Sequence, residues 1–223
     1  MISRRLARTL YLDEHALQAS LFVIVAPSGA GKTTLVHALL RSRPGIKLSI
    51  STTTRLPRNT ERDGLDYFFV DEAKFLALAS QSAFLEWAQV HGHYYGTSKA
   101  FVENTLAVGE DLLLEIDCQG AAQIKSLFPE AVIIFIAPPS IHELERRLEA
   151  RAQDDAASIA KRIKAAQSEL QRAHEADYLV INDDFDQALL DLHRIVEAAG
   201  LRYHLRLSRN PLLAQRLGLR SYP

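Results

Sequence analysis

A nine-residue stretch near the N-terminus carries the strongest chemical signal in the sequence. It consists of Ala26, Pro27, Ser28, Gly29, Ala30, Gly31, Lys32, Thr33 and Thr34. It meets the pattern G-x-x-x-x-G-K-[ST] at every position except the first, where Ala26 replaces glycine. Gly29 and Gly31 let backbone N–H groups approach phosphate oxygens closely. Lys32 adds charge for the β- and γ-phosphates, and the Thr33 hydroxyl is an oxygen ligand for Mg²⁺. The stretch therefore predicts a phosphate-binding loop.

The residues on either side of this loop predict a strand and a helix. The apolar run 21–25 is typical of a buried parallel strand, and apolar residues recur at helical spacing over 35–40 until Pro44. Such a helix points its free N–H groups and positive dipole end at bound phosphate. Alanine at position 26 would cost about 1–2 kcal/mol if the loop required a positive φ there, and almost nothing if the backbone is extended.

The composition suits one globular domain without a strong charge bias. The 223 residues are 48% hydrophobic and 24% charged, with a net charge of −1. We therefore expect no nucleic-acid or membrane partner, and no apolar run reaches the roughly 18 residues of a membrane span. The single cysteine, Cys118, excludes an internal disulfide and favours a reducing compartment. We expect a cytoplasmic location, with an organelle matrix as the alternative, and a homo-oligomer stays open.

Apolar runs and helical patterns alternate along the chain. Strands are predicted at 21–25, 46–51, 112–117, 131–136 and 178–181, with helices between them. Five such strands imply an α/β fold with a parallel sheet covered by helices on both faces. Residues 51–97 form a strand-rich insertion with strands at 66–70 and 84–90, a helix from 72 to 79 and a turn at 91–96; the proline-bearing stretch 52–58 is excluded from a central strand. The basic tail 201–223 is expected to be irregular.

Four helix starts are predicted, three of them at polar capping residues. Asp71 caps the helix in the insertion, and Thr97 or Ser98 caps the one that ends near Gly109. Ser140 forms a capping box with Glu143, and a further helix begins near residue 121. Basic and apolar residues in the first twenty positions are compatible with a transit peptide, but the acidic pair at 13–14 favours a short arm.

Two features of the insertion point to ligand binding. Arg55 and Arg58 lie in a proline-restrained loop and suit a second phosphate, with a hydrogen bond from the Tyr67 hydroxyl. Spacing alone, however, favours a solvated charged loop. Glu86 lies between two apolar residues, where an unpaired carboxylate is costly. Either a ligand with two adjacent N–H donors, such as the guanine edge, or a nearby arginine would satisfy it.

A longer pattern includes these residues. It runs through 51–58, Glu61, 63–64, 66–67 and Phe69, then through 84–88, 94–97, 115–120 and 182–184. In this form it resembles the signature of the guanylate kinase family over about residues 21–200. The resemblance implies a three-layer P-loop NTPase fold with a GMP-binding insertion and a helical lid. It divides the chain into an N-terminal arm (1–20), a kinase domain (21–200) and the tail (201–223). Within the domain, the core is 21–50, 98–146 and 170–200, the insertion is 51–97 and the lid is 147–169.

The resemblance also implies the reaction, which is Mg²⁺-dependent transfer of the ATP γ-phosphoryl group to GMP. Guanine is then bound by Ser51, Glu86, Thr97 and Asp117, and the GMP phosphate by Arg55, Arg58, Tyr67 and Tyr95. ATP is bound by the phosphate-binding loop, Arg147 and Asn182, and Asn182 would lie near the adenine. The catalytic residues are Lys32, Arg55, Arg151 and Arg162, and Thr33 is the metal ligand. Glu115 and Asp117 are both placed for water-mediated contact with Mg²⁺, and a structural carboxylate is the alternative for Glu115.

Two other functions stay open at this point. One is a guanylate-kinase-like binding module without catalysis, which typically lacks the loop and the arginines that this chain has. The other is a related P-loop kinase that acts on a different phosphorylated acceptor, against which Glu86 and Thr97 argue. Cys118 is expected to be a small buried residue, and His91 and His93 to be exposed turn residues.

Overall fold

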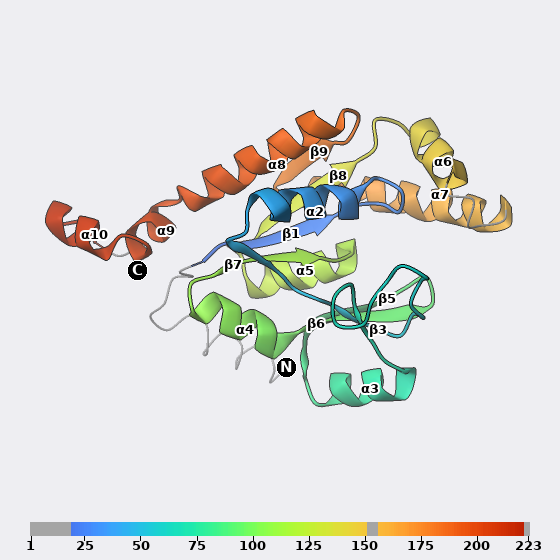
Figure 1. Ribbon diagram of the computed structural model, residues 1–223, viewed down its shortest axis with the longest axis horizontal. Coiled ribbons are helices and arrows are strands. Elements are labelled where there is room, and N and C mark those ends of the chain that lie inside the picture. The colour runs from blue at the N-terminus through green and yellow to red at the C-terminus, as the bar shows by residue number, and fades with distance from the viewer. Residues whose placement is uncertain (1–18, 151–155, 221–223) are drawn as a thin grey trace.

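A parallel sheet forms the centre of the computed structural model, which describes residues 19–150 and 156–220 (Figure 1). Its five strands lie in the order β2–β7–β1–β8–β9. They are β1 (Leu21–Val25), β2 (Ile46–Leu48), β7 (Asp111–Glu115), β8 (Val132–Ala137) and β9 (Tyr178–Ile181). The predicted α/β fold is confirmed. Because β1 is central, the loop that follows it opens at the carboxyl edge of the sheet, where such folds bind ligands.

Different helices cover the two faces of the sheet (Figure 1). They are α2 (Lys32–Ser42) and α8 (Phe185–Gly200) on one face, and α4 (Lys99–Ala107) and α5 (Cys118–Leu127) on the other. Along β1, Leu21, Val23 and Val25 pack toward α4 and α5, whereas Phe22 and Ile24 pack toward α2 and α8. All five side chains are at most 2% exposed. Burial on both faces explains why the run has no polar alternation.

The observed helix starts agree in part with those predicted from the sequence. The predicted caps at Asp71 and Ser140 are confirmed, because each side chain accepts a hydrogen bond from the backbone N–H three residues later. The second half of the box at Ser140 is absent, since Glu143 binds Arg146 and Arg147 instead. Of the two candidates for the next cap, Ser98 fills the position. The start predicted near residue 121 is wrong: α5 begins at Cys118 and is capped by Asp117.

The insertion contains a second sheet with four strands in the order β4–β3–β6–β5. Its elements are β3 (Thr52–Thr53), β4 (Phe68–Phe69), α3 (Glu72–Ser80), β5 (Phe84–Val90) and β6 (His93–Ser98). The exclusion of 52–58 from a central strand is wrong for β3, which pairs on both sides because the proline follows only at 57. The turn expected at 91–96 is limited to His91 and Gly92, whose positive φ closes a tight hairpin.

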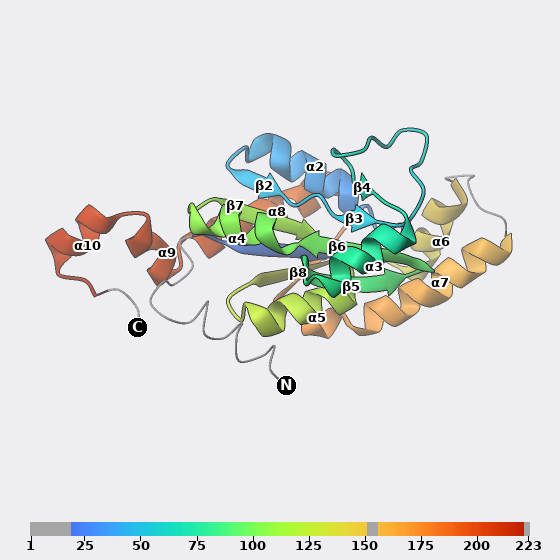
Figure 2. The ribbon, with the colours of Figure 1, turned by 90° about the horizontal axis from the view of Figure 1, so that it is seen from below.

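Two further groups of helices lie at opposite ends of the molecule (Figure 2). At one end are α6 (Ile141–Ala150) and α7 (Ala156–Gln171), followed by the 3₁₀ turn η1 (Ala173–Glu175). Leu144, Leu148 and Ala166 form a small core there, with Ile159 and Ile163 packed against it. The proposed lid, 147–169, covers parts of both helices, and its boundaries remain a prediction. The polar break at 152–155 lies outside the described residues.

The expectation of an irregular tail is wrong. Residues 203–217 form α9 (Tyr203–Ser208) and α10 (Pro211–Leu217) at the end of the molecule opposite α6 (Figure 2). Leu205 and Leu207 are buried, and Arg209 pairs with Asp111 at the start of β7. Each helix spans too few residues for its apolar spacing to be recognised in the sequence.

Two expectations concern the ends of the chain and the membrane. The arm predicted over 1–20 lies almost wholly outside the described residues. Among the helices of the described part of the chain, none combines the length and apolar character of a membrane span.

Candidate active site

The loop between β1 and α2 has the backbone geometry of a phosphate-binding loop. Gly29 and Gly31 have φ angles of 94° and 89°, and the N–H of Ala30 donates to the carbonyl of Pro27 at 3.1 Å. The positive φ values favour glycine at both positions. Ala26 is not among the residues with a positive φ. Of the two cases left open for this position, the unstrained one is therefore correct.

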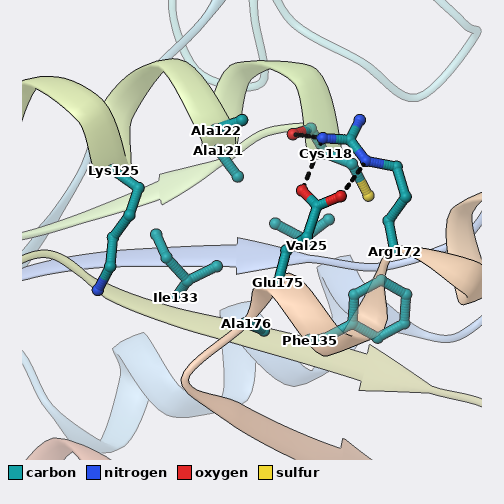
Figure 3. Close-up of a pocket in the computed structure, with 10 residues that line it drawn as sticks. All are labelled: Val25, Cys118, Ala121, Ala122, Lys125, Ile133, Phe135, Arg172, Glu175 and Ala176. Atoms are coloured by element: carbon teal, nitrogen blue, oxygen red, sulfur yellow. Dashed lines mark hydrogen bonds and ion pairs between the residues drawn. The ribbon is translucent and has the colours of Figure 1, made fainter.

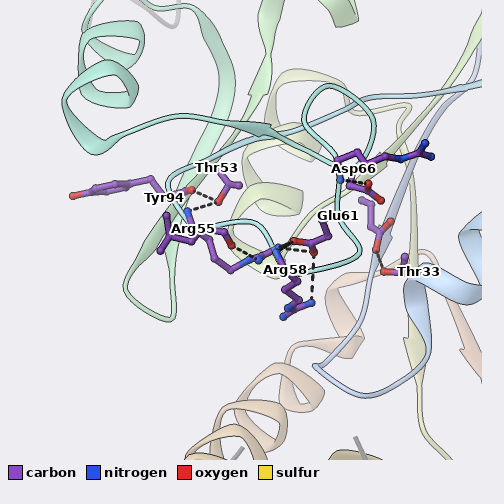
Figure 4. Close-up of polar contacts among 10 residues, drawn as sticks. Thr33, Thr53, Arg55, Arg58, Glu61, Asp66 and Tyr94 are labelled. Atoms are coloured by element: carbon purple, nitrogen blue, oxygen red, sulfur yellow. Dashed lines mark hydrogen bonds and ion pairs between the residues drawn. The ribbon is translucent and has the colours of Figure 1, made fainter. Parts of the chain in front are cut away.

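The side chains at the start of α2 contact the end of β7. The Lys32 ammonium donates to the carbonyl of Ile116 at 3.3 Å and lies 4.0 Å from a carboxylate oxygen of Glu115. The Thr33 hydroxyl donates to the same carboxylate at 2.6 Å (Figure 4). Glu115 therefore holds both side chains that the loop motif assigns to phosphate and metal. A hydroxyl beside a carboxylate is an all-oxygen donor set, which suits a hard cation.

The two arginines of the insertion are organised by Glu61. One amino group of Arg55 donates to both carboxylate oxygens of Glu61, at 2.7 and 2.9 Å (Figure 4). The backbone N–H of Arg58 donates to the same carboxylate at 2.8 Å, and its guanidinium lies 3.7 Å away. The guanidinium of Arg55 also lies over the ring of Tyr67, 5.4 Å from its centre. We call Arg55, Arg58 and Glu61 the arginine clamp. The loop is thus ordered rather than freely solvated.

Glu86 lies in a buried polar site of the insertion. Its side chain is 4% exposed, and its carboxylate accepts a hydrogen bond from the Thr97 hydroxyl at 2.5 Å. Among the described residues, no arginine pairs with it, so the alternative of an arginine partner is wrong. Burial raises the pKa of Glu86 to about 7, with a further contribution from the charge of Asp117. Ser51, the residue immediately before β3, is also buried.

The first turn of α5 closes one side of this site. The side chain of Asp117 accepts a hydrogen bond from the backbone N–H of Gly120 at 2.9 Å and so begins the helix. A Cβ atom on Gly120 would lie only 2.5 Å from a carboxylate oxygen of Glu86. Glycine is therefore required where the helix meets the buried carboxylate. This contact between 86 and 120 could not be inferred from either segment alone.

Two of the arginines assigned to the lid, Arg147 and Arg162, lie on α6 and α7. The Arg147 guanidinium donates to Glu143 at 2.7 Å and to the backbone carbonyl of Asn182 at 3.0 Å. The Asn182 amide donates to the carbonyl of Ala30 in the phosphate-binding loop at 2.7 Å. Arg162 lies on the wall of the cleft described next. Arg151 lies outside the described residues.

One cleft brings the loop, the clamp and α7 together. It has a volume of about 650 Å³, within the range of small-molecule sites. Its walls include most of the loop, from Ala26 to Thr34 without Ala30, and also Arg55, Arg58, Tyr67, Tyr95, Asp117 and Arg162. Ser51, Glu86 and Thr97 do not line it; their side chains are buried. The predicted phosphate residues of both substrates therefore share one open space.

The cleft also contains residues to which the sequence assigned no role. Lys161 and Glu169 of α7 line it, and so do His91 and His93. Burial lowers the pKa of His91, and the positive charges of Arg162 and Lys161 lower it further. His91 is an exposed turn residue, as expected, whereas the expectation is wrong for His93, which is partly buried and begins β6; both line the cleft. The charged residues of α7 could be placed here only once the packing of that helix is known.

A second, much smaller cavity lies between α5 and η1 (Figure 3). Its volume is about 30 Å³, which leaves room for roughly one water molecule. Cys118 lies on its wall, and burial raises the pKa of this thiol to about 11. Arg172 donates to the carbonyl of Cys118 and pairs with Glu175. The cysteine is buried and protonated at neutral pH, as expected of a packing residue.

Comparisons with known proteins agree with this geometry. The family model described as guanylate kinase matches residues 18–199. The guanylate kinase of Methylobacillus flagellatus is 52% identical over 201 residues, which cover 90% of this chain and all of that protein. That of Dechloromonas aromatica is 49% identical with the same coverage. A crystal structure of guanylate kinase from Anaplasma phagocytophilum aligns with a TM-score of 0.74 and 31% identity, covering 92% of this chain and 98% of that one. On this sequence and structural similarity, the chain belongs to the guanylate kinase family.

Proposed function

We propose that this chain transfers the γ-phosphoryl group of ATP to GMP and releases ADP and GDP. The observation that carries the proposal is the shared cleft, which has a phosphate-binding loop on one side and two arginines on the other. Phosphoryl transfer between two nucleotides requires two phosphate sites in line across one cavity. Membership of the guanylate kinase family identifies the acceptor as GMP.

On the donor side, the loop binds the phosphates of ATP. The N–H groups at the start of α2 and the Lys32 ammonium interact with the β- and γ-phosphates. Mg²⁺ fits the donor set at Thr33, because this cation takes few protein ligands and retains waters and phosphate oxygens. When bound, it neutralises charge on the β- and γ-oxygens. The carboxylate of Glu115 holds the Thr33 hydroxyl at this point.

On the acceptor side, Arg55, Arg58, Tyr67 and Tyr95 bind the GMP phosphate. Glu86 accepts hydrogen bonds from the N1–H and the 2-amino group of guanine, with Ser51, Thr97 and Asp117 completing the base site. Adenine has neither of these donors, so the buried carboxylate would lose both hydrogen bonds to the base. A site built around such a polar group can discriminate by roughly 10⁴ or more.

The reaction needs no covalent enzyme intermediate. An oxygen of the GMP phosphate attacks the γ-phosphorus, the bond to the bridging β,γ-oxygen breaks, and its electron pair leaves on the β-phosphate of ADP. The acceptor oxygen is already anionic, so no strong general base is required. The charge on the transferring group is stabilised by Lys32, Arg55 and the lid arginines Arg151 and Arg162. Arg147 helps to bind ATP. A cytoplasmic location is part of this proposal, because the single cysteine favours a reducing compartment.

A coupled assay of ADP release tests the proposal. Mg-ATP is the donor, and GMP, dGMP, AMP, CMP and UMP are compared as acceptors. We expect turnover with GMP and little with AMP. Comparable rates with AMP would contradict the role of Glu86. No turnover with any acceptor, from a folded protein, would favour a binding module instead.

A further inference from the structure

Asn182 connects three parts of the protein. It follows β9 directly, and its side chain is 7% exposed. Its backbone N–H donates to the carbonyl of Ala137 at the end of β8, at 2.8 Å. Its side-chain amide donates to Ala30 in the phosphate-binding loop, and its carbonyl accepts from Arg147 of α6. The sheet therefore fixes the backbone of a residue that contacts both the loop and the lid.

The hydrogen bond to Ala30 fixes the orientation of one peptide group. In a trans peptide, the C=O and the following N–H point in opposite directions. When the carbonyl of Ala30 points at Asn182, the N–H of Gly31 must point the other way. Gly31 lines the cleft, whereas Ala30 and Asn182 are not among its lining residues. The amide of Asn182 therefore orients an N–H group of the loop toward the place of the phosphates.

The contact is close enough to restrict the residue at position 31. A Cβ atom on Gly31 would lie 2.4 Å from the amide nitrogen of Asn182, and the φ of 89° already favours glycine. The amide and the glycine therefore fit together. The approach of Asn182 to the loop is a specific contact rather than general packing.

Helix α6 contacts the phosphate-binding loop close to Asn182 (Figure 1). A Cβ atom on Gly29 would lie 3.1 Å from the side chains of Leu144 and Leu148, both of which are buried. Arg147, between them on α6, binds the carbonyl of Asn182. The position of α6 and the orientation of the loop peptide thus depend on the same residue.

We propose that Asn182 is a positioning residue for the triphosphate of the donor nucleotide. Its amide orients the Ala30–Gly31 peptide so that the loop presents its N–H groups, and its carbonyl links this orientation to Arg147. This inference rests on the proposed function, in which ATP occupies the loop. It differs from the role near adenine that the family resemblance implies, because it acts on the phosphates and is independent of the base.

Equilibrium binding separates the two roles. The Asn182→Ala variant is compared with the wild type for ATP, inorganic tripolyphosphate and GMP, each with Mg²⁺. Loss of one buried hydrogen bond to the loop should weaken ATP and tripolyphosphate by the same factor, about tenfold, and GMP by less than about twofold. In turnover, the KM for ATP should rise by a similar factor while the KM for GMP stays nearly constant. Asn104→Ala, an exposed position on α4, is the matched control and should change nothing.

Three results would overturn the proposal. Weaker ATP binding with unchanged tripolyphosphate binding would indicate a contact with the base. Unchanged affinity for both would show that the loop is formed without the amide. Equal weakening of all three ligands, together with a lower thermal unfolding midpoint, would indicate a purely structural role. If the alanine variant does not fold, Asn182→Ser is measured in the same way.

The test does not depend on turnover. If the wild-type protein phosphorylates no acceptor, the proposed function fails, but the binding constants for ATP and tripolyphosphate still decide the role of Asn182.

Discussion

The two phosphate sites of the cleft are built from different parts of the chain. The loop of residues 26–34 uses backbone N–H groups, whose directions are fixed by two positive-φ glycines and the start of a helix. The arginine clamp uses flexible side chains, and it is Glu61 that orders them. A carboxylate lies in each site, Glu115 beside Lys32 and Thr33 in the first and Glu61 in the second, but the backbone sets the directions of the loop N–H groups. A backbone site is rigid wherever the chain folds correctly, whereas a side-chain site needs additional residues to hold its charges.

The largest effect is expected at the loop, from Lys32→Ala. This change removes a full charge beside the transferring group, and kcat should fall by about 10³-fold or more, with little change in the KM for GMP. Lys47→Ala, at an exposed lysine of β2, is the control and should retain normal rates. A Lys32→Ala variant that kept a tenth of the wild-type kcat would contradict the placement of this charge beside the transferring group.

A smaller but more selective effect is expected from Glu86→Gln. The amide presents only one acceptor oxygen to guanine, so the KM for GMP should rise by about 10²-fold, while the KM for ATP stays the same. Selectivity for GMP over AMP should fall with it. The control Glu103→Gln, on α4, should leave both values unchanged. Preserved selectivity in the Glu86 variant would place base recognition elsewhere.

Glu86 also predicts a pH dependence. Its pKa in the folded protein is about 7, above the ordinary value of 4.5. GMP needs the ionised form, so its KM should rise by up to about tenfold per pH unit below 7. Glu86→Gln should lose this part of the profile and keep the part due to the phosphate of GMP. An unchanged profile in the variant would contradict the assignment.

The raised pKa of Glu86 also predicts how the stability of the folded protein depends on pH. Because the folded protein binds this proton more tightly than the unfolded chain, the free energy of unfolding should decrease as pH rises from 4.5 to 7. Glu86→Gln removes the buried charge and should stabilise the unliganded protein above pH 7, by on the order of 1 kcal/mol. Chemical denaturation of the wild type and the variant at pH 5 and pH 8 measures both the decrease with pH and the stabilisation by the substitution.

An intermediate effect is expected at Glu61. Glu61→Gln keeps the size of the side chain but removes the charge that orients Arg55, so the KM for GMP should rise by about tenfold. Glu72→Gln, an exposed residue of the same insertion, is the control. A lower KM for GMP would instead mean that Glu61 competes with the phosphate for the arginines.

The smallest effect is expected from Ala26→Gly, which restores the glycine of the loop pattern. Because Ala26 has no positive φ, kcat and KM should stay within about twofold of the wild type. A large gain in kcat would show that alanine strains the loop during turnover.

The difference between the two sites also explains what the sequence could predict. The loop, the central strands and most helices are encoded in contiguous residues, and their periodicity and glycine spacing were sufficient. The GMP residues were identified through a family resemblance, because no local pattern distinguishes an ordered arginine loop from a solvated one. Glu61 belongs to that motif, but its contacts with Arg55 and Arg58 appear only after folding.

Several contacts between distant segments could not be predicted from local sequence patterns. Gly120 must be small because Glu86, 34 positions earlier in the chain, lies against it. Asn182 contacts Ala30, which lies 152 positions earlier in the chain. The helices α9 and α10 are stabilised by burial and by the pair between Arg209 and Asp111, which short segments do not reveal.

A crystal structure with GMP and a non-hydrolysable ATP analogue tests the central claim most directly, because it locates both phosphates at once. We predict the GMP phosphate within hydrogen-bond distance of Arg55 and Arg58, the guanine edge on Glu86, and the β-phosphate of the analogue on the N–H groups of the loop. A GMP phosphate bound in the loop, or a base remote from Glu86, would contradict the account.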